Sequence, residues 1–141
     1  MRKDCARFSS RRSDRLLYYA EEDLKAGWSD ADVRASVARI LEIQRSVEQA
    51  GKRFVFVLAP DKSAVYSTCF VEARPGSRAP RINELLIAAG VNAPDMTAEY
   101  ERRINTVVDL YNPDDTHWSN AGHVLAGQTV ARFVGGGKSV P

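Results

Sequence analysis

The sequence predicts an α/β layer fold, in which strands and helices alternate along a single domain. Two apolar runs, Arg53–Ala59 and Thr106–Tyr111, are typical of strands covered on both faces by helices. Segments with apolar residues at three- and four-residue steps separate and follow these runs, as amphipathic helices do. This alternation of strands and helices is typical of an α/β layer architecture. The length of 141 residues suits one domain.

Composition and charge exclude several classes of protein. Hydrophobic residues make up 44% and charged residues 27%, which excludes a fully disordered, collagen-like or coiled-coil chain. A net charge of +2 gives no reason to expect a nucleic-acid partner. The longest apolar run, Phe54–Ala59, is far shorter than the roughly 20 residues that span a bilayer. The basic start of the chain has no apolar segment after it, so we expect neither a secretory signal nor a membrane segment.

The first half of the chain predicts two strands around one long helix. Leu16–Ala20 is a short apolar run with aromatic residues, which favours a strand. Ser29 or Asp30 can cap the helix that follows, and Gly51 stands where a left-handed residue ends a helix. Arg53–Ala59 is the next strand, which Pro60 ends. The helix is indicated by five apolar residues at helical spacing: Val33, Val37, Ile40, Leu41 and Val47.

The second half predicts three helices and one strand. A helix around Ile82–Ala89 ends at Gly90, and Thr97 is a candidate cap for a short helix over Ala98–Ile104. Thr106–Tyr111 is the strand. Ser119 or Asn120 can then cap a last helix, which runs through Val124, Leu125, Val130 and Phe133 and ends at Gly135–Gly137.

We therefore expect a domain over residues 15–134, a basic flexible arm over 1–14 and a flexible tail over 135–141. Cys5 and Cys69 are too few for a disulfide scaffold and fit no paired zinc motif, so Cys69 is expected to be a small buried residue.

The candidate site lies in the loop that follows the second strong strand. Open α/β sheets bind ligands beyond the carboxyl ends of their strands, where this loop and the turn Pro60–Ser63 are expected. His117 can act as a general base if Asp115, two residues earlier, holds its ring in the right tautomer. Trp118 can wall the cleft. The alternative is a surface loop in which Asp114 or Asp115 only caps the following helix.

Two blocks of residues carry a resemblance to a known family. Phe54-Val-Phe-Val-Leu-Ala-Pro-Asp-Lys62 with Val65-Tyr66, and then Asp115-Thr-His-Trp118 with Gly122, occur in this order. The chain from about Asp14 to Phe133 resembles the SGNH-hydrolase-like domain of the alginate O-acetylation proteins and related polysaccharide acetylation proteins. The resemblance implies a three-layer, flavodoxin-like α/β sheet with flanking helices.

The resemblance also implies roles for individual residues. Asp115 and His117 correspond to the acid and base of a Ser-His-Asp triad, and Lys62 and Tyr66 could bind an anionic sugar or simply form a turn and its aromatic packing. The family's serine block lies downstream of the Asp-x-His block, so we expect this chain to end before the nucleophile. Four nearby hydroxyl or thiol groups stand in no Gly-x-Ser-x-Gly elbow: Ser63, Ser67, Cys69 and Ser119.

The implied function is O-acetyl transfer or ester hydrolysis on an exported or cell-surface polysaccharide, without a metal or organic cofactor. The partners would be a polysaccharide acceptor and an acyl donor. Family members usually work outside the cytoplasm, but we expect no signal peptide or membrane segment in this chain, so its compartment stays open. One alternative is a catalytically silent half-domain or binding fragment. Another is a metal-dependent hydrolase that uses His117 and His123, although their spacing is unlike compact zinc pairs. The two apolar strands are expected to be buried on both faces. A sheet that ends early would leave an apolar edge unpaired, which predicts association through that edge.

Overall fold

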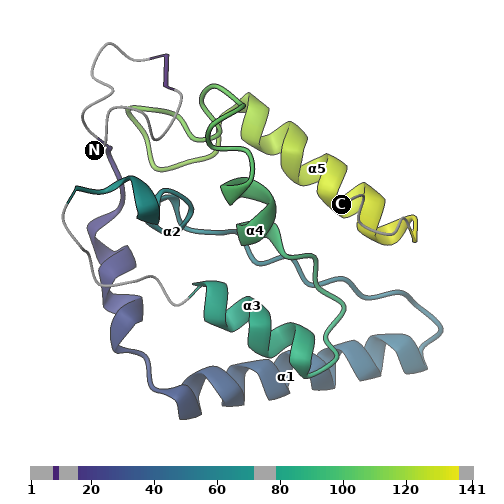
Figure 1. Cartoon of the computed structure of the whole chain (residues 1–141). Helices are drawn as coiled ribbons and strands as arrows, with labels where there is room; N and C mark the ends of the chain where they lie inside the picture. Colours follow the sequence, from purple (N-terminus) through teal and green to yellow (C-terminus); the bar gives the residue numbers. More distant parts are fainter. Residues whose placement is uncertain (1–7, 10–15, 72–78, 137–141) are drawn as a thin grey trace.

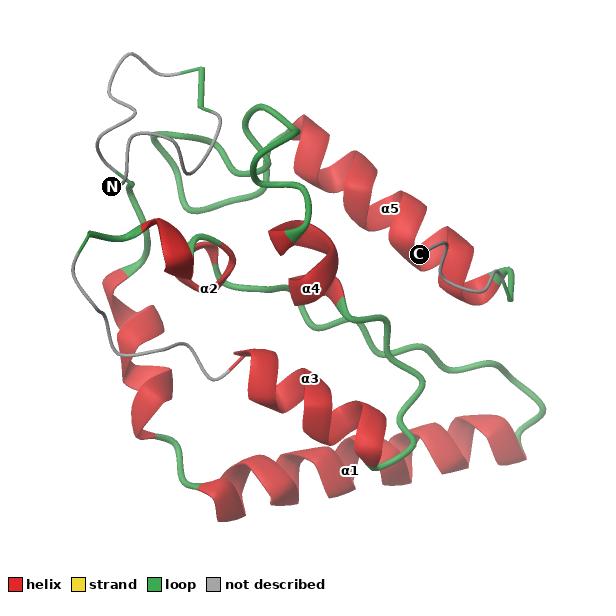
Figure 2. Cartoon of the chain, in the orientation of Figure 1, coloured by secondary structure: helices red, strands yellow, loops and turns green. Residues whose placement is uncertain are grey.

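A computed structural model describes residues 8–9, 16–71 and 79–136 of the chain. The described residues form helices joined by extended segments and turns (Figure 2). In chain order the elements are η1 (Ala20–Gly27), α1 (Asp30–Gln49), α2 (Lys62–Val65), η2 (Ser67–Cys69), α3 (Ala79–Ala88), α4 (Met96–Glu101) and α5 (Asn120–Val134), where η marks a 3₁₀ helix. In Figure 1, α1 and α3 lie together at one end of the molecule, and α4 and α5 lie towards the other.

The predicted three-layer sheet is wrong for the described part of the chain. Its β structure is one isolated antiparallel bridge between Tyr111 and Trp118. The predicted strand Arg53–Ala59 is an extended segment, and among the described residues one backbone hydrogen bond, from Phe56 N to Asn92 O at 2.8 Å, joins it to another extended segment. A strand exists only where a neighbour supplies a ladder of such bonds, and one bond does not make a ladder.

The other two predicted strands fail for local reasons. The segment 16–19 has no regular structure, and η1 begins at Ala20. Thr106 N and Val107 N both donate to Arg103 O, which continues a helical turn from the preceding residues. Asp109 then takes a φ of 53°, a left-handed conformation that interrupts an extended run. The apolar character of 106–111 instead serves burial, since Leu110 and Tyr111 are both buried.

The predicted helices are present, with one shifted start. Ser29 caps α1, because its side chain accepts from Asp32 N at 3.1 Å, and Gly51 follows the helix with a φ of 71°. A short helix near 98–104 is observed as α4, but Asp95 caps it through Ala98 N at 3.0 Å. Thr97, the predicted cap, lies inside α4 and is buried. Its hydroxyl accepts from Asn83 Nδ2 instead.

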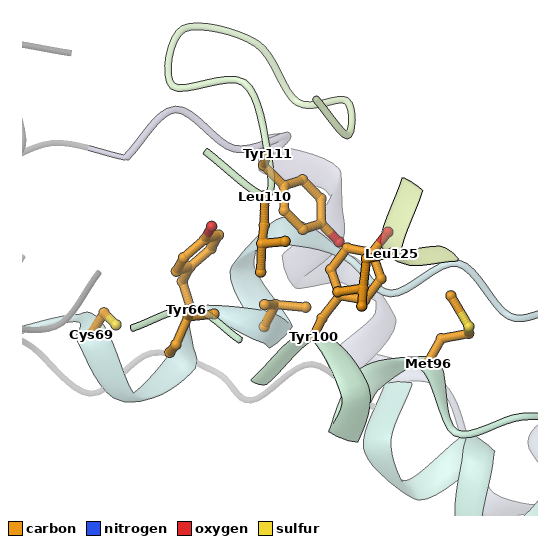
Figure 3. Close-up of a cluster of buried hydrophobic side chains, with 9 residues drawn as sticks. Tyr66, Cys69, Met96, Tyr100, Leu110, Tyr111 and Leu125 are labelled. Atoms are coloured by element: carbon orange, nitrogen blue, oxygen red, sulfur yellow. The ribbon is translucent and has the colours of Figure 1, made fainter. Parts of the chain in front are cut away.

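The core consists of two clusters of buried side chains. The tyrosine cluster (Figure 3) consists of side chains from α2, η2, α4, the segment between α4 and α5, and α5: Val65, Tyr66, Cys69, Met96, Tyr100, Ile104, Leu110, Tyr111 and Leu125. The α1–α3 cluster comprises Val37, Leu86, Val91 and Ala93, with partly buried residues such as Phe54, Phe56 and Leu58 packed against it. The extended segment 53–59 thus covers the α1–α3 cluster with one side, while Val57 on its other side is 40% exposed.

Cys69 is fully buried, as the sequence predicts, and it is disulfide-bonded. The other cysteine, Cys5, lies outside the described residues, as do most of the predicted arm over 1–14 and tail over 135–141. Within the described ranges, no helix is both long and apolar enough to cross a membrane.

Candidate functional site

Asp115 and His117 form a hydrogen-bonded pair on the loop between Tyr111 and Trp118. The imidazole Nδ1 of His117 lies 2.6 Å from Asp115 Oδ1, and the backbone amide of His117 donates to the same oxygen at 2.9 Å. A carboxylate at Nδ1 favours the tautomer with the proton there, which leaves Nε2 as the proton acceptor. The amide of His117, and then its ring, hold the pKa of Asp115 below its usual range. Both side chains are exposed to solvent.

The loop is closed at its base by backbone hydrogen bonds. Asn112 N donates to His117 O at 3.0 Å, and Ser119 N donates to Leu110 O at 3.1 Å, on either side of the Tyr111–Trp118 bridge. The Asn112 side chain adds a bond from Nδ2 to Trp118 O at 3.3 Å. The pair therefore stands on a small loop with fixed ends.

Helix α5 holds the same loop from the other side. The prediction that Ser119 caps the last helix is confirmed, since its hydroxyl accepts from Ala121 N at 3.0 Å and Gly122 N at 3.3 Å. That hydroxyl also donates to Asp109 O. Gly122 permits the close approach of α5 to the backbone of Leu110, because a Cβ at this position would lie 2.2 Å from Leu110 O. This steric demand explains a glycine five residues after His117.

Trp118 stands between the tyrosine cluster and the second histidine. Its ring centroid lies 5.2 Å from that of Tyr100 and 5.6 Å from that of His123, the latter in an edge-on arrangement. His123 Nδ1 is 2.8 Å from Ser119 O, a carbonyl and not a carboxylate. The two histidines therefore differ, because only His117 has an acid at Nδ1.

These residues border a cleft of about 390 Å³. Three of the five predicted site residues line it: Lys62, His117 and Trp118. Asp115 is not among the lining residues, but its carboxylate contacts the His117 ring. Tyr66 lies in the tyrosine cluster, 1% exposed, with ring centroids of Phe8 and Tyr111 at 5.1 and 5.9 Å. The other residues of the lining are Tyr19, Glu22, Lys25, Ala59, Pro60, Asp61, Tyr111, Thr116 and His123.

One wall of the cleft was not predicted. Glu22 of η1 is buried, and its carboxylate accepts from Ser63 N at 3.0 Å and from Tyr19 N at 3.2 Å. Lys25 Nζ lies 2.6 and 2.7 Å from the two carboxylate oxygens of Asp61. These contacts fasten η1 to the turn before α2. No spacing rule connects residues about forty positions apart, so the sequence alone offers no signal for them.

Lys62 is buried at the floor of the cleft, with 1% of its surface exposed. Its ammonium group donates to the carbonyl oxygens of Asn112 at 2.7 Å and Asp115 at 2.9 Å, with Pro113 O at 3.4 Å. Burial is the main cause that lowers the pKa of Lys62 to about 8, and Asp115 and Glu22 oppose it. Within the described residues, no group of three or more His, Cys, Asp or Glu side chains is arranged to hold a metal ion.

The comparison with protein families defines the class of this chain as an SGNH hydrolase-like domain. Residues 13–139 match the family model described as "SGNH hydrolase-like domain, acetyltransferase AlgX", and the chain belongs to this family. It is similar to the probable alginate O-acetylase AlgJ of Pseudomonas putida, with 26% identity over 125 residues. That match covers 86% of this chain but 32% of the relative, so the chain spans about a third of the relative's length. No solved structure matches the chain.

Proposed function

We propose that this chain contributes the acid and base of a serine-type O-acyl transfer site that acts on a polysaccharide. The observation that carries the proposal is the 2.6 Å contact between Asp115 Oδ1 and His117 Nδ1 beside the cleft. It places a carboxylate on one ring nitrogen and leaves the other as the base, the arrangement that activates a hydroxyl nucleophile. Family membership supports acetyl transfer, and the name of the Pseudomonas putida relative supports alginate as the polymer.

The nucleophile is proposed to come from outside the described residues. Ser119 is engaged as a helix cap on three sides, by two amides and one carbonyl, so its hydroxyl is not poised to attack an ester. In the first half of the reaction, His117 would remove the proton of a serine hydroxyl, the serine oxygen would attack the acetyl carbonyl, and the donor's C–O bond would break as the proton passes to the leaving oxygen. In the second half, His117 would remove the proton of a sugar hydroxyl, which would attack the acetylated serine, and the proton would return to the serine oxygen as its bond to the acetyl group breaks. Asp115 would stabilise the imidazolium that forms between the two steps.

The test is ester turnover by the whole chain, measured with the activated ester p-nitrophenyl acetate. An imidazole held as a base acts on an activated ester even without a serine, and a positioned general base is worth about 10²–10⁴ in rate. We expect His117→Ala to remove turnover above the buffer rate and Asp115→Asn to lower it strongly. His123→Ala is the matched control, because it removes the other cleft histidine but not the pair.

Equal losses in the His117 and His123 variants, or no loss in either, would overturn the proposal. A second candidate, a catalytically silent binding fragment, is favoured by the exposure of both members of the pair, at 80% for His117 and 52% for Asp115. It predicts no turnover by the wild-type chain, together with oligosaccharide binding that Trp118→Ala weakens. Calorimetric titration with acetylated mannuronate oligosaccharides measures that binding.

A further inference from the structure

The turn Pro60–Lys62 touches a different wall of the cleft with each of its residues. Pro60 O accepts from the Tyr111 hydroxyl at 2.5 Å, and Asp61 is paired with Lys25 of η1. Lys62 reaches across to the carbonyl oxygens of the loop that bears Asp115 and His117. Of the three, only Lys62 is bonded to the part of the loop between Asn112 and Asp115.

The Lys62 ammonium is committed to this loop. A buried ammonium is strongly destabilising unless hydrogen bonds replace its lost hydration. Among the described residues, its three hydrogen-bond partners are backbone carbonyl oxygens between 112 and 115. The ammonium also faces the Phe8 ring, whose centroid lies 5.9 Å from Nζ. A side chain engaged in this way is poorly placed to bind a substrate anion as well.

The carbonyls that Lys62 holds determine where the pair stands. Asp115 O belongs to the same residue as the acid, and Asn112 is bonded through its amide to His117 O at 3.0 Å. Fixing the carbonyls of Asn112 and Asp115 therefore fixes the peptide units on both sides of the turn from which the carboxylate projects. The pair itself is exposed, so packing of its side chains does not hold it.

We propose that Lys62 is a positioning residue, which holds the loop so that Asp115 stays in hydrogen-bond contact with Nδ1 of His117. It touches neither His117 nor the carboxylate of Asp115, and it acts through the backbone. The catalytic importance of this role rests on the proposed function. The contact between Asp115 and His117 can nevertheless be measured in a chain that shows no turnover.

The protonation state of Lys62 changes in an experimentally accessible pH range. Its pKa of about 8 means that the ammonium loses one of its three N–H donors above that pH. Four carboxylates favour the charged form against the cost of burial: Asp115, Glu22, Asp114 and Asp109. Between about 8 and 10.5 the unfolded chain binds more protons at this lysine, so its contribution to the free energy of unfolding rises with pH. A loosened loop in this range is therefore distinct from global unfolding.

The primary test is nuclear magnetic resonance of the His117 ring, recorded on the whole chain with ¹⁵N-labelled histidine. In the wild type we expect the Nδ1–H tautomer with a strongly deshielded proton, and a loss of that signal with a midpoint near pH 8. Lys62→Met removes the charge and all three donors, while it keeps an unbranched side chain of similar length. In this variant we expect a mixture of His117 tautomers and no change of the His117 signals with a midpoint near pH 8.

Lys25→Met is the matched control, since it removes a lysine from the same cleft that contacts Asp61 and not the loop. A Lys62→Met chain whose His117 tautomer and pH profile equal those of the wild type would overturn the inference. If this variant does not fold, the wild-type profile still decides, because a His117 signal that does not follow the Lys62 titration would also overturn it.

Turnover separates this inference from the proposed function. Where the wild type turns over ester, misplacement of the pair is expected to lower kcat about 10²-fold with little change in KM. Unchanged kcat in Lys62→Met would contradict the positioning role and leave the proposed function standing. An absence of turnover in the wild type, with the His117 signals as expected, would contradict the proposed function alone.

Discussion

The tyrosine cluster under the cleft and the α1–α3 cluster at the other end of the molecule are built from different contacts. Tyr100 and Tyr111 donate through their hydroxyls to backbone carbonyl oxygens, of Gly122 at 2.7 Å and Pro60 at 2.5 Å. The buried members of the α1–α3 cluster have only apolar side chains. Polar links beside it come from Gln44 and Glu48, which join α1 to the residues after α3, at Gly90 and Asn92.

The difference follows from what each cluster supports. Helices satisfy their own backbone, so α1 and α3 need only apolar packing between them. The cleft is made of turns and loops, whose buried carbonyls need partners from elsewhere, and tyrosine hydroxyls and the Lys62 ammonium supply them. Burial raises the pKa of Tyr100 and Tyr111, so both remain donors throughout the neutral range. Four predictions test this contrast, from the largest expected effect to the smallest.

Leu86→Ala should have the largest effect, because Leu86 is fully buried between α1 and α3. Removal of a buried leucine side chain leaves a cavity and destabilises by about 4 kcal/mol. The measurement is the free energy of unfolding in urea. Ile87→Ala is the control, since Ile87 is the next residue of the same helix and is 51% exposed. Equal losses in the two variants would show that the α1–α3 cluster is not packed as described.

Gly122→Ala should destabilise the cleft side by about 3 kcal/mol, because the new methyl group would overlap Leu110 O and force α5 from the loop. Gly127→Ala lies in the same helix, with no atom within 4 Å of the added Cβ, and should stabilise by about 0.5–1 kcal/mol. The opposite signs of the two changes, read from thermal unfolding, test the close approach. Two changes of the same sign would contradict it.

Tyr111→Phe should cost about 2 kcal/mol, because it keeps the ring but leaves Pro60 O buried without its donor. Tyr19→Phe removes a hydroxyl from an exposed tyrosine of the same cleft and should change the stability little. Urea unfolding of both variants compares them. If the Tyr111 variant is as stable as the wild type, hydroxyl donors are not what holds the cleft side together.

Protonation of Asp115 should have the smallest effect on stability. The pKa of Asp115 is lowered, first by the amide of His117 and then by its ring, so the contact is complete above the ordinary carboxyl range and is lost as pH falls through the lowered pKa. Carbon-13 resonances of the carboxyl group report the titration. In His117→Ala the amide remains, so the pKa of Asp115 should rise only partway. A full return to the ordinary value would mean that the amide contributes nothing.

Local features of the fold could be predicted from the sequence, and long-range ones could not. The cap at Ser29 and the left-handed Gly51 depend on residues within a few positions, and the structure has both. A strand requires hydrogen bonds from a neighbouring strand. The apolar run Arg53–Ala59 does not reveal whether it pairs in a sheet or only packs against a pair of helices, because both arrangements need the same apolar residues. The predicted sheet failed for this reason.

The candidate site divides in the same way. The contact of Asp115 with His117 spans two residues and follows from a turn, so the pattern predicted it. Lys62 was predicted as a site residue, but its partners lie about fifty residues away, and nothing in its own segment indicates that they are carbonyl oxygens. Glu22 was missed entirely, because an acid in a charged stretch gives no sign that it will be buried.

The position of Trp118 gives the site an optical readout. Its indole lies between Tyr100 and His123 on the loop that bears the base, while Trp28, the other tryptophan of the chain, is 47% exposed beside η1. In a Trp28→Phe chain the emission spectrum would come from Trp118 alone, and it would depend on the contacts of the indole with Tyr100 and His123. Fluorescence of this chain would then report any change in the surroundings of the loop, such as ligand binding in the cleft, without an attached dye.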